Sequence, residues 1–286
     1  MDNLIDIWIS HAEKNWLETL HNHAEDLFST TFLPSHDHHH HRRVWNICRN
    51  LLREIATFNT LMDESLVEGV LIAACFHDLG MVHSTQEDHG HLGREICETY
   101  FKKSTIHPPS RFVEILSAIE QHDIKEKKIY SGIHPDTSPG ILDILSIADD
   151  LEALGVIGIY RYTEIYLKRN VTLHNLGIRI LGNATARFKN ISESCTNCPL
   201  LIREYHRQYS DLVSFFDSYN QQLLIERDPG EVYYGHIGVV NYIRTLSVEG
   251  ETRPENFLRK VGVNNPGTII TNFFTSLHHE LDQARL

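Results

Sequence analysis

The sequence predicts an all-α fold, a helical bundle followed by additional C-terminal helices. Two observations lead to this prediction. Apolar residues recur at helical spacing along most of the chain, and the alternating patterns typical of strands are missing. One apolar series consists of Val44, Ile47, Cys48, Leu51, Leu52 and Ile55. With 286 residues, 41% of them hydrophobic, the chain is long enough to bury a sizeable core.

Breaks and caps divide the first half of the chain into helices. Pro34 interrupts the pattern, Asp63 suits a helix start and Gly80 suits a helix end. Residues 125–138 form a polar loop that contains a proline and a glycine. The helices are expected at about 4–28, 40–55, 66–76, 88–103, 109–122 and 141–154.

Residues that mark helix boundaries are less clear in the second half of the chain. Helices are expected near 156–169, 171–190, 199–226, 237–247, 254–261 and 267–283. We expect one domain over residues 1–165 and a C-terminal helical extension over residues 166–286 packed on it, or one continuous domain. The C-terminal helices are also where we expect a homodimer contact.

Charge and termini restrict the class of protein. The formal net charge of −12 argues against a non-specific nucleic-acid binder. Residues 1–6 lack the basic and apolar pattern of a signal peptide. No apolar run is expected to approach the roughly 20 residues of a membrane span. We therefore expect a cytoplasmic protein with no membrane partner.

Six histidine and aspartate residues lie on inward-facing helix positions. His77 follows Ala73 by four residues and Asp149 follows Leu145 by four, and residues at such offsets share a face. A single histidine on an apolar stripe is usually a hydrogen-bonded core residue, but six such residues favour a metal site inside a bundle. Imidazole and carboxylate together suit Fe, Mn, Zn, Ni or Co better than Ca or Mg. The six residues are His40, His77, Asp78, His89, His122 and Asp149.

Three local strings resemble the HD superfamily of metal-dependent phosphohydrolases. Residues 40–44 resemble the H-x-x-R-V helix start, residues 74–80 the HD-[LI]-G signature and residues 148–155 the A-D-x-L-[DE]-A-L-G segment. The resemblance covers about residues 30–165 and implies an HD-domain helical bundle. It also implies that one divalent transition-metal ion is held by four residues. These are His40, His77, Asp78 and Asp149.

A further segment, residues 89–93, resembles the H-x-x-x-G element of binuclear HD proteins. By this resemblance Asp78, His89 and His122 would hold a second ion, with Asp78 bridging the two. In a one-metal enzyme the two histidines would contact substrate phosphate instead. Met81 stands where many relatives have lysine, and the Gly-Tyr-Pro signature of cyclic-di-nucleotide phosphodiesterases is missing, which puts cleavage of cyclic di-nucleotides in doubt.

The resemblance implies hydrolysis of a phosphate ester or anhydride in a small phosphorylated substrate, with nucleotides among the candidates. Asp78 would ligate metal and accept a proton from the attacking water. Cationic side chains are needed to stabilise the charge of the transition state. The candidates, each of which could equally be a solvated surface group, are Arg43, Arg94, Lys125 and Arg161.

Two alternatives stay open at this point. Some helical HD relatives use the same four histidines and two aspartates to hold two irons and activate oxygen, which makes a di-iron HD-type oxygenase one alternative. A non-catalytic ligand-sensing HD protein is the other. Four more histidines in the same cluster are expected to face solvent or to support the metal ligands: His36, His38, His39 and His41.

Overall fold

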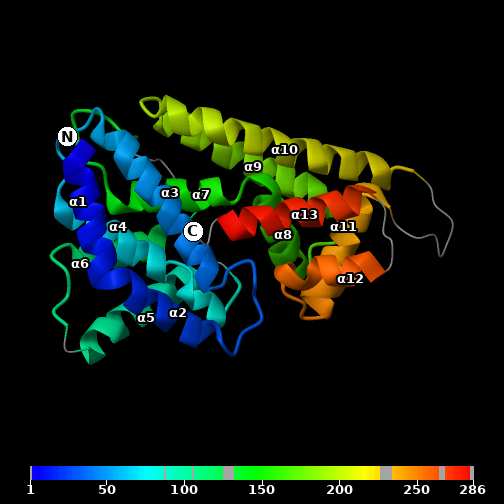
Figure 1. The fold of residues 1–286 in the computed structure, drawn as a ribbon, viewed down its shortest axis with the longest axis horizontal. Coiled ribbons are helices and arrows are strands. Elements are labelled where there is room, and N and C mark those ends of the chain that lie inside the picture. The colour runs from blue at the N-terminus through cyan, green and yellow to red at the C-terminus, as the bar shows by residue number, and fades with distance from the viewer. Residues whose placement is uncertain are drawn as a thin grey trace. The chain divides into compact units, whose positions relative to one another are not determined.

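The computed structural model describes residues 2–86, 88–104, 106–124, 132–225, 234–263 and 268–283. Within these residues the secondary structure is helical and no segment forms a β-strand, so the all-α prediction is confirmed (Figure 1). The chain divides into two compact units. The first contains residues 1–152 and 189–203, and the second contains residues 153–188 and 204–286.

The first unit is built around α4, whose residues from Leu66 to Phe76 are almost all buried. Helices α3, α6 and α7 pack around it, and α1 and α2 cover it further. Its helices are α1 (Asp2–Ala12), the π-helical η1 (Glu13–Leu17), α2 (Glu18–Phe28), α3 (His38–Ala56), α4 (Glu64–Phe76), the 3-10 turn η2 (Leu79–Val82), α5 (His89–Lys103), α6 (Phe112–Gln121) and α7 (Ile141–Glu152).

Side-chain caps define where two of these helices begin. The Asp37 carboxylate accepts a hydrogen bond from the His39 backbone N–H at the start of α3. The Asp63 carboxylate accepts one from the Leu66 N–H at the start of α4. These bonds satisfy N–H groups that have no partner within the helix, which is why acidic residues are favoured at this position.

Helix α6 begins at Phe112, later than the expected start at residue 109. The Phe112 N–H donates to the Pro109 carbonyl in a turn that precedes the helix. The Arg111 guanidinium donates to the Asp63 carboxylate at 3.1 Å and to the Ser65 hydroxyl at 2.8 Å. These contacts with α4 hold Arg111 outside the helix, and local propensity could not reveal them.

One segment, Glu64–Val82, is long and apolar enough to cross a membrane by length and composition, with a mean hydropathy of 1.5. The expectation that no run approaches this length is therefore wrong for this segment. However, 83% of its most apolar window is buried inside the structure. Because the core helix of a soluble protein passes the same test, the segment is weak evidence for a span.

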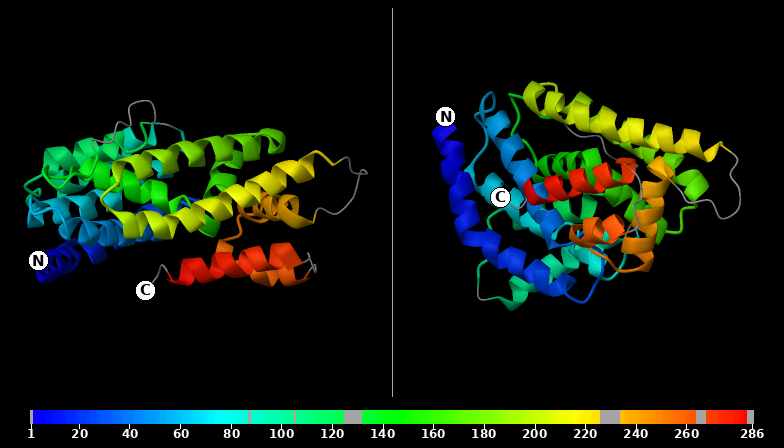
Figure 2. Two further views of the ribbon diagram at one scale, coloured as in Figure 1. Left: turned by 90° about the horizontal axis from the view of Figure 1, so that it is seen from above. Right: turned by 45° about the vertical axis from the view of Figure 1, so that its right-hand side comes forward.

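The second unit contains the remaining helices, except that residues 189–194 and 199–203 belong to the first unit. Helix α13 packs against α8 and α11, and the rings of Phe257 and Phe274 meet edge to face at 4.9 Å. Helices α9 and α10 lie side by side (Figure 2), and the rings of Phe188 and Tyr209 stack at 4.4 Å between them. The helices are α8 (Gly155–Lys168), α9 (Leu173–Ser194), α10 (Pro199–Leu223), α11 (Gly235–Ile243), the π-helical η4 (Arg244–Glu249), the 3-10 turn η5 (Pro254–Asn256), α12 (Phe257–Val263) and α13 (Thr268–Gln283).

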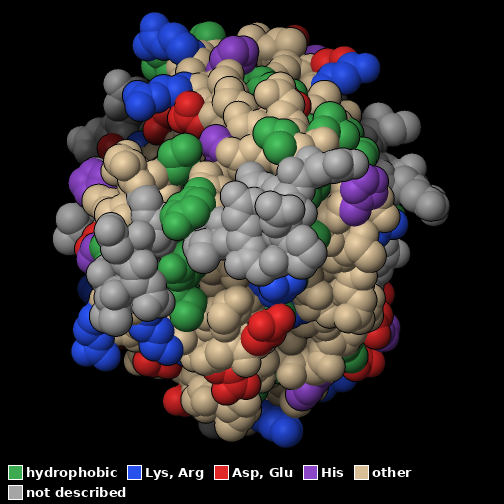
Figure 3. Space-filling model, turned by 90° about the vertical axis from the view of Figure 1, so that its right-hand side faces the viewer, with side chains coloured by type: hydrophobic (Ala, Val, Ile, Leu, Met, Phe, Trp, Pro, Cys, Tyr) green, Lys and Arg blue, Asp and Glu red, His purple; other side chains and the backbone are tan. Residues whose placement is uncertain are grey.

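Charged side chains are mixed on the face drawn in Figure 3. Lysine and arginine alternate there with aspartate and glutamate, and no continuous basic band is visible among the described residues. On this face the mixture agrees with the net charge of −12.

Candidate metal centre

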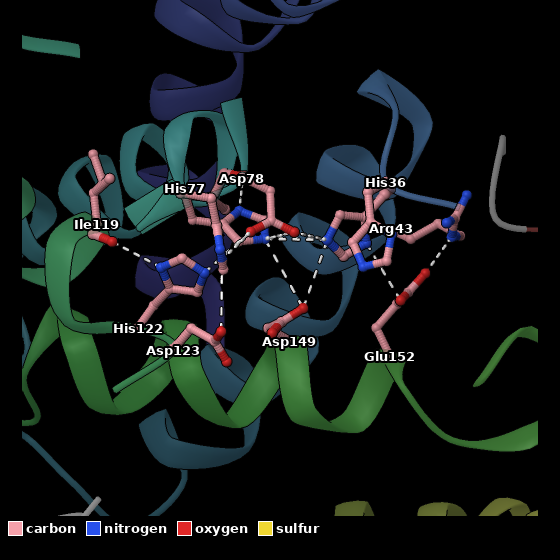
Figure 4. A network of polar contacts seen from close by, with 12 residues as sticks. His36, Arg43, His77, Asp78, Ile119, His122, Asp123, Asp149 and Glu152 are labelled. Carbon is pink, nitrogen blue, oxygen red and sulfur yellow. Dashed lines mark hydrogen bonds and ion pairs between the residues drawn. The ribbon is translucent and has the colours of Figure 1, made fainter. Parts of the chain in front are cut away.

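Two histidines and two aspartates converge in the first unit: His40, His77, Asp78 and Asp149, called here the first group. His40 lies in the first turns of α3, and His77 and Asp78 directly follow α4. Asp149 lies in α7. Each side chain offers one ligand atom, and these atoms all lie within 4.8 Å of one another (Figure 4). All four residues are buried.

Several ligand atoms of the first group lie within hydrogen-bond or ion-pair distance of one another. The His40 Nε2 lies 3.1 Å from the His77 Nε2 and 3.6 Å from the Asp149 Oδ1. The Asp78 Oδ2 lies 3.3 Å from the same His40 nitrogen. Two imidazole nitrogens and two carboxylate oxygens around one point form the donor set that Fe, Mn, Zn, Co or Ni prefers. The residues therefore fit a divalent transition-metal ion.

A second group consists of Asp78, His89 and His122, whose ligand atoms also lie within 4.8 Å of one another. The Asp78 Oδ1 lies 3.1 Å from the His122 Nε2 and 3.4 Å from the His89 Nε2. His89 is the first residue of α5, and His122 directly follows α6. The structure thus brings together all six residues that the sequence placed on inward faces, although their roles as ligands stay predictions.

Asp78 is shared between the groups through different oxygens. Its Oδ2 faces His40 and its Oδ1 faces His89 and His122. A carboxylate that presents one oxygen to each of two ligand sets has the geometry of a bridge between two ions.

The histidine rings are oriented by hydrogen bonds on the sides away from the groups. The Nδ1 of His77 bonds the Ala74 carbonyl at 2.9 Å, and the Nδ1 of His122 bonds the Ile119 carbonyl at 2.7 Å. His89 makes the same kind of bond to the Gln86 carbonyl. With Nδ1 donating to a carbonyl, Nε2 would present its lone pair to a bound ion once its own proton is lost, as histidine ligands of metal sites commonly do.

Burial and charge set the protonation of the centre. Burial lowers the pKa of His77 to about 4, so its ring is neutral near pH 7. Burial alone would raise the pKa of Asp78, but the charge that His77 carries when it is protonated, together with hydrogen bonds from His122 and His40, holds the pKa of Asp78 well below its usual range. A neutral imidazole beside an ionised carboxylate is the state that binds a metal ion.

In the metal-free protein the pKa of His89 is shifted in the opposite direction to that of His77. Burial lowers its pKa, but the hydrogen bond and charge of Asp78 outweigh burial and raise the pKa to about 9. A raised pKa in a folded histidine stabilises the fold fully below pH 6.5, and this contribution is lost as pH rises through about 9.

Chelator-treated protein should therefore lose stability between pH 6.5 and 9. The loss should be at most on the order of 3 kcal/mol, because each pKa unit corresponds to about 1.36 kcal/mol. Urea unfolding of the metal-free protein at several pH values measures it. His89→Gln should flatten the dependence in this range, and an equal slope in that variant would show that His89 is not responsible.

Glu152 is a supporting residue that was not among the predicted site residues, although it occupies the [DE] position of the segment 148–155. Its Oε2 lies 3.3 Å from the His40 Nδ1, and its Oε1 accepts a hydrogen bond from the Arg43 Nε at 2.5 Å. Glu152 follows Asp149 by three residues on α7, so helical spacing was the signal that could have found it. Arg43, a candidate for contacting substrate, is buried and paired with Glu152 instead of standing alone.

Glu152→Gln is expected to weaken binding of the ion in the first group by roughly 10- to 100-fold, as is typical when a partner of a ligating histidine is lost. Competition with a coloured chelator measures this change. Glu120→Gln is the matched control, because Glu120 also bonds a histidine Nδ1, that of His91, but does so at the surface. Equal effects of the two substitutions would contradict the role of Glu152.

Asp123 is a second residue that sequence reasoning missed. Its Oδ2 lies 3.7 Å from the His89 Nε2, and its side chain is mostly buried. Asp123 directly follows His122, so the chain contains two His-Asp pairs in one centre. Its position makes it a candidate further ligand of the second group.

The remaining candidates are more scattered. Lys125 lies outside the described residues. Arg161 is buried in α8 of the second unit. Arg94 donates to the Glu120 carboxylate at 3.2 Å. Of the four extra histidines, which were expected to face solvent or to support the metal ligands, His36, His38 and His41 are buried and His39 is partly exposed.

The comparisons with known proteins agree with this geometry. Residues 37–154 match the family model described as the HD domain, and the matched segment contains every member of both groups. No curated protein and no solved structure matches the chain.

Proposed function

We propose that this chain, whose residues 37–154 form an HD domain, is a phosphohydrolase that acts on a phosphate ester or anhydride of a small molecule such as a nucleotide. The domain belongs to a superfamily of metal-dependent hydrolases. The observation that supports the proposal most is Asp78, which presents one carboxylate oxygen to each of two histidine sets.

A divalent ion held by the first group would lower the pKa of water to about 7 and polarise a phosphoryl oxygen. The protein's own residues provide the rest. His40, His77 and Asp149 would fix the position of the ion, while the ionised Asp78 would accept a proton from the attacking water. Glu152 holds His40 and Arg43 in place. Both groups are buried, which strengthens their electrostatic effect on a bound phosphate.

Elemental analysis of the purified protein together with a panel of phosphate monoesters, diesters and anhydrides tests this proposal. The expected result is one or two ions of Mn, Fe, Co, Ni or Zn per chain and release of phosphate that a chelator abolishes. Absence of turnover across the panel, with metal content unchanged in Asp78→Asn, would favour a non-catalytic ligand-sensing protein. The cytoplasmic location stays a prediction.

The di-iron oxygenase is the second candidate, and one observation favours it: four histidines and two aspartates form two groups that share Asp78. This reading predicts about two irons per chain after aerobic purification and consumption of oxygen when substrate is added. Phosphate release with Mn, Ni or Zn, without consumption of oxygen, would exclude it.

A further inference from the structure

A third cluster of metal-ligand side chains lies outside both groups. His21, His38 and His39 present ring nitrogens that all lie within 4.8 Å of one another. We propose that these residues, called here the three-histidine cluster, form a separate binding site for a zinc-class ion such as Zn²⁺, Co²⁺, Ni²⁺ or Cu²⁺. This proposal does not rest on the hydrolase activity.

Two helices supply the cluster. His21 lies in α2, and His38 and His39 are the first two residues of α3. The ring centroids of His38 and His39 are 4.0 Å apart, and those of His21 and His38 are 5.0 Å apart. His38 is only 8% exposed, and the other two are partly exposed, so an ion could enter from solvent. The cap from Asp37 to the His39 N–H fixes the turn that brings the pair to α2.

Glu25 is placed to complete the coordination. It follows His21 by four residues, so the two share a face of α2. Its Oε1 lies 4.0 Å from the His38 Nε2. Three imidazoles and one carboxylate form a four-ligand set that suits zinc. Glu18 adds negative charge near His21, and Arg42 is the opposing cation.

Small movements would bring the nitrogens to bonding distance. Zinc binds imidazole nitrogen at about 2.0–2.1 Å in a tetrahedron, which requires ligand atoms about 3.3 Å apart. Rotation of exposed imidazole rings by a rotamer adjustment covers the difference from the present spacing. Such an ion would connect α2 to the first turn of α3.

The three-histidine cluster shares no ligand with the first or second group. His40 follows His39 directly, but successive residues on a helix point about 100° apart. The His40 ring accordingly faces His77, whereas the rings of His38 and His39 face His21. Loss of the cluster can therefore be separated from loss of the HD centre.

The test compares His21→Ala with His107→Ala in the full chain. His107 is an exposed histidine outside every cluster and serves as the matched control. Chelator-stripped proteins are titrated with Zn²⁺, and bound zinc per chain is measured after dialysis. His21→Ala should bind one ion fewer than the wild type and the control.

Two further measurements sharpen the result. The affinity for this ion should fall at least about 100-fold in His21→Ala, because losing even an indirect partner of a ligand costs 10- to 100-fold. Zinc should raise the melting temperature of the wild type more than that of the variant, because an ion that binds only the folded state stabilises it. His39→Gln should reproduce both effects. Zinc stoichiometry and affinity equal to those of the wild type in both variants would overturn the proposal.

Discussion

Asp78→Asn is expected to remove metal from both groups at once and to reduce hydrolysis at least about 1000-fold. Asparagine keeps the volume of the side chain but loses the charge that compensates a divalent ion. Metal catalysis contributes several kcal/mol of transition-state stabilisation, and each 1.36 kcal/mol is a factor of ten in rate. Elemental analysis and the rate of phosphate release measure the two effects, and circular dichroism checks that the helices remain.

Variants that affect one group only provide the matched controls. Asp149→Asn removes a ligand of the first group, and His122→Gln removes a ligand of the second. If Asp78 bridges two ions, each control should lose one ion, whereas Asp78→Asn should lose two. An ion lost from His122→Gln but not from Asp149→Asn would show that Asp149 is not needed to hold the ion of the first group. Two ions retained in Asp78→Asn would contradict the bridge.

Helix positions in the first unit followed from local sequence because caps and apolar spacing agree there. The expected ranges 66–76 and 88–103 match α4 and α5 closely. The Asp63 side chain that caps α4 is visible in the sequence as an acidic residue before an apolar run. The late start of α6 was missed because Arg111 is held by residues about 46 positions away, and such contacts leave no local signal.

Helical phase also predicted which residues of the centre point inward. It could not show that the two oxygens of Asp78 face different histidines, because phase fixes a helix face and not a side-chain rotamer. Asp123 and Glu152 were missed because each is recognised only through the histidine it contacts. Asp123 lies next to His122, and Glu152 occupies the [DE] position of the segment 148–155, but tertiary packing decides whether such residues are ligands, supports or surface groups.

The burial of the histidines next to His40 also depends on tertiary contacts that local sequence does not reveal. A run of polar residues in a sequence suggests a solvated turn, but here other helices cover it. The ring of His41 packs against Phe28 of α2 and against His77, and that of His38 packs against His21. Burial of this run depends on α2, and its own composition gives no sign of it.

Gly80→Ala is expected to destabilise the protein by at least about 3 kcal/mol and to displace His89 from the second group. A Cβ at Gly80 would lie 2.0 Å from the His89 carbonyl oxygen and 2.8 Å from the Gly93 nitrogen. Both atoms belong to the backbone of α5, so the helix itself must move. Overpacking usually costs 1–3 kcal/mol, and a clash with backbone belongs at the upper end or beyond. Urea unfolding and zinc content measure the two effects.

The matched control for this substitution is Gly182→Ala in α9. A Cβ there would meet nothing within 4 Å, so only the helix propensity changes. Alanine is favoured over glycine inside a helix by about 0.5–1 kcal/mol, and the control should become more stable by that amount. A loss of stability in Gly80→Ala together with a gain in Gly182→Ala would show that the effect at Gly80 comes from its close contact with the α5 backbone and not from helix propensity. If Gly80→Ala kept wild-type stability and its full metal content, the contact between η2 and α5 would not be what positions His89.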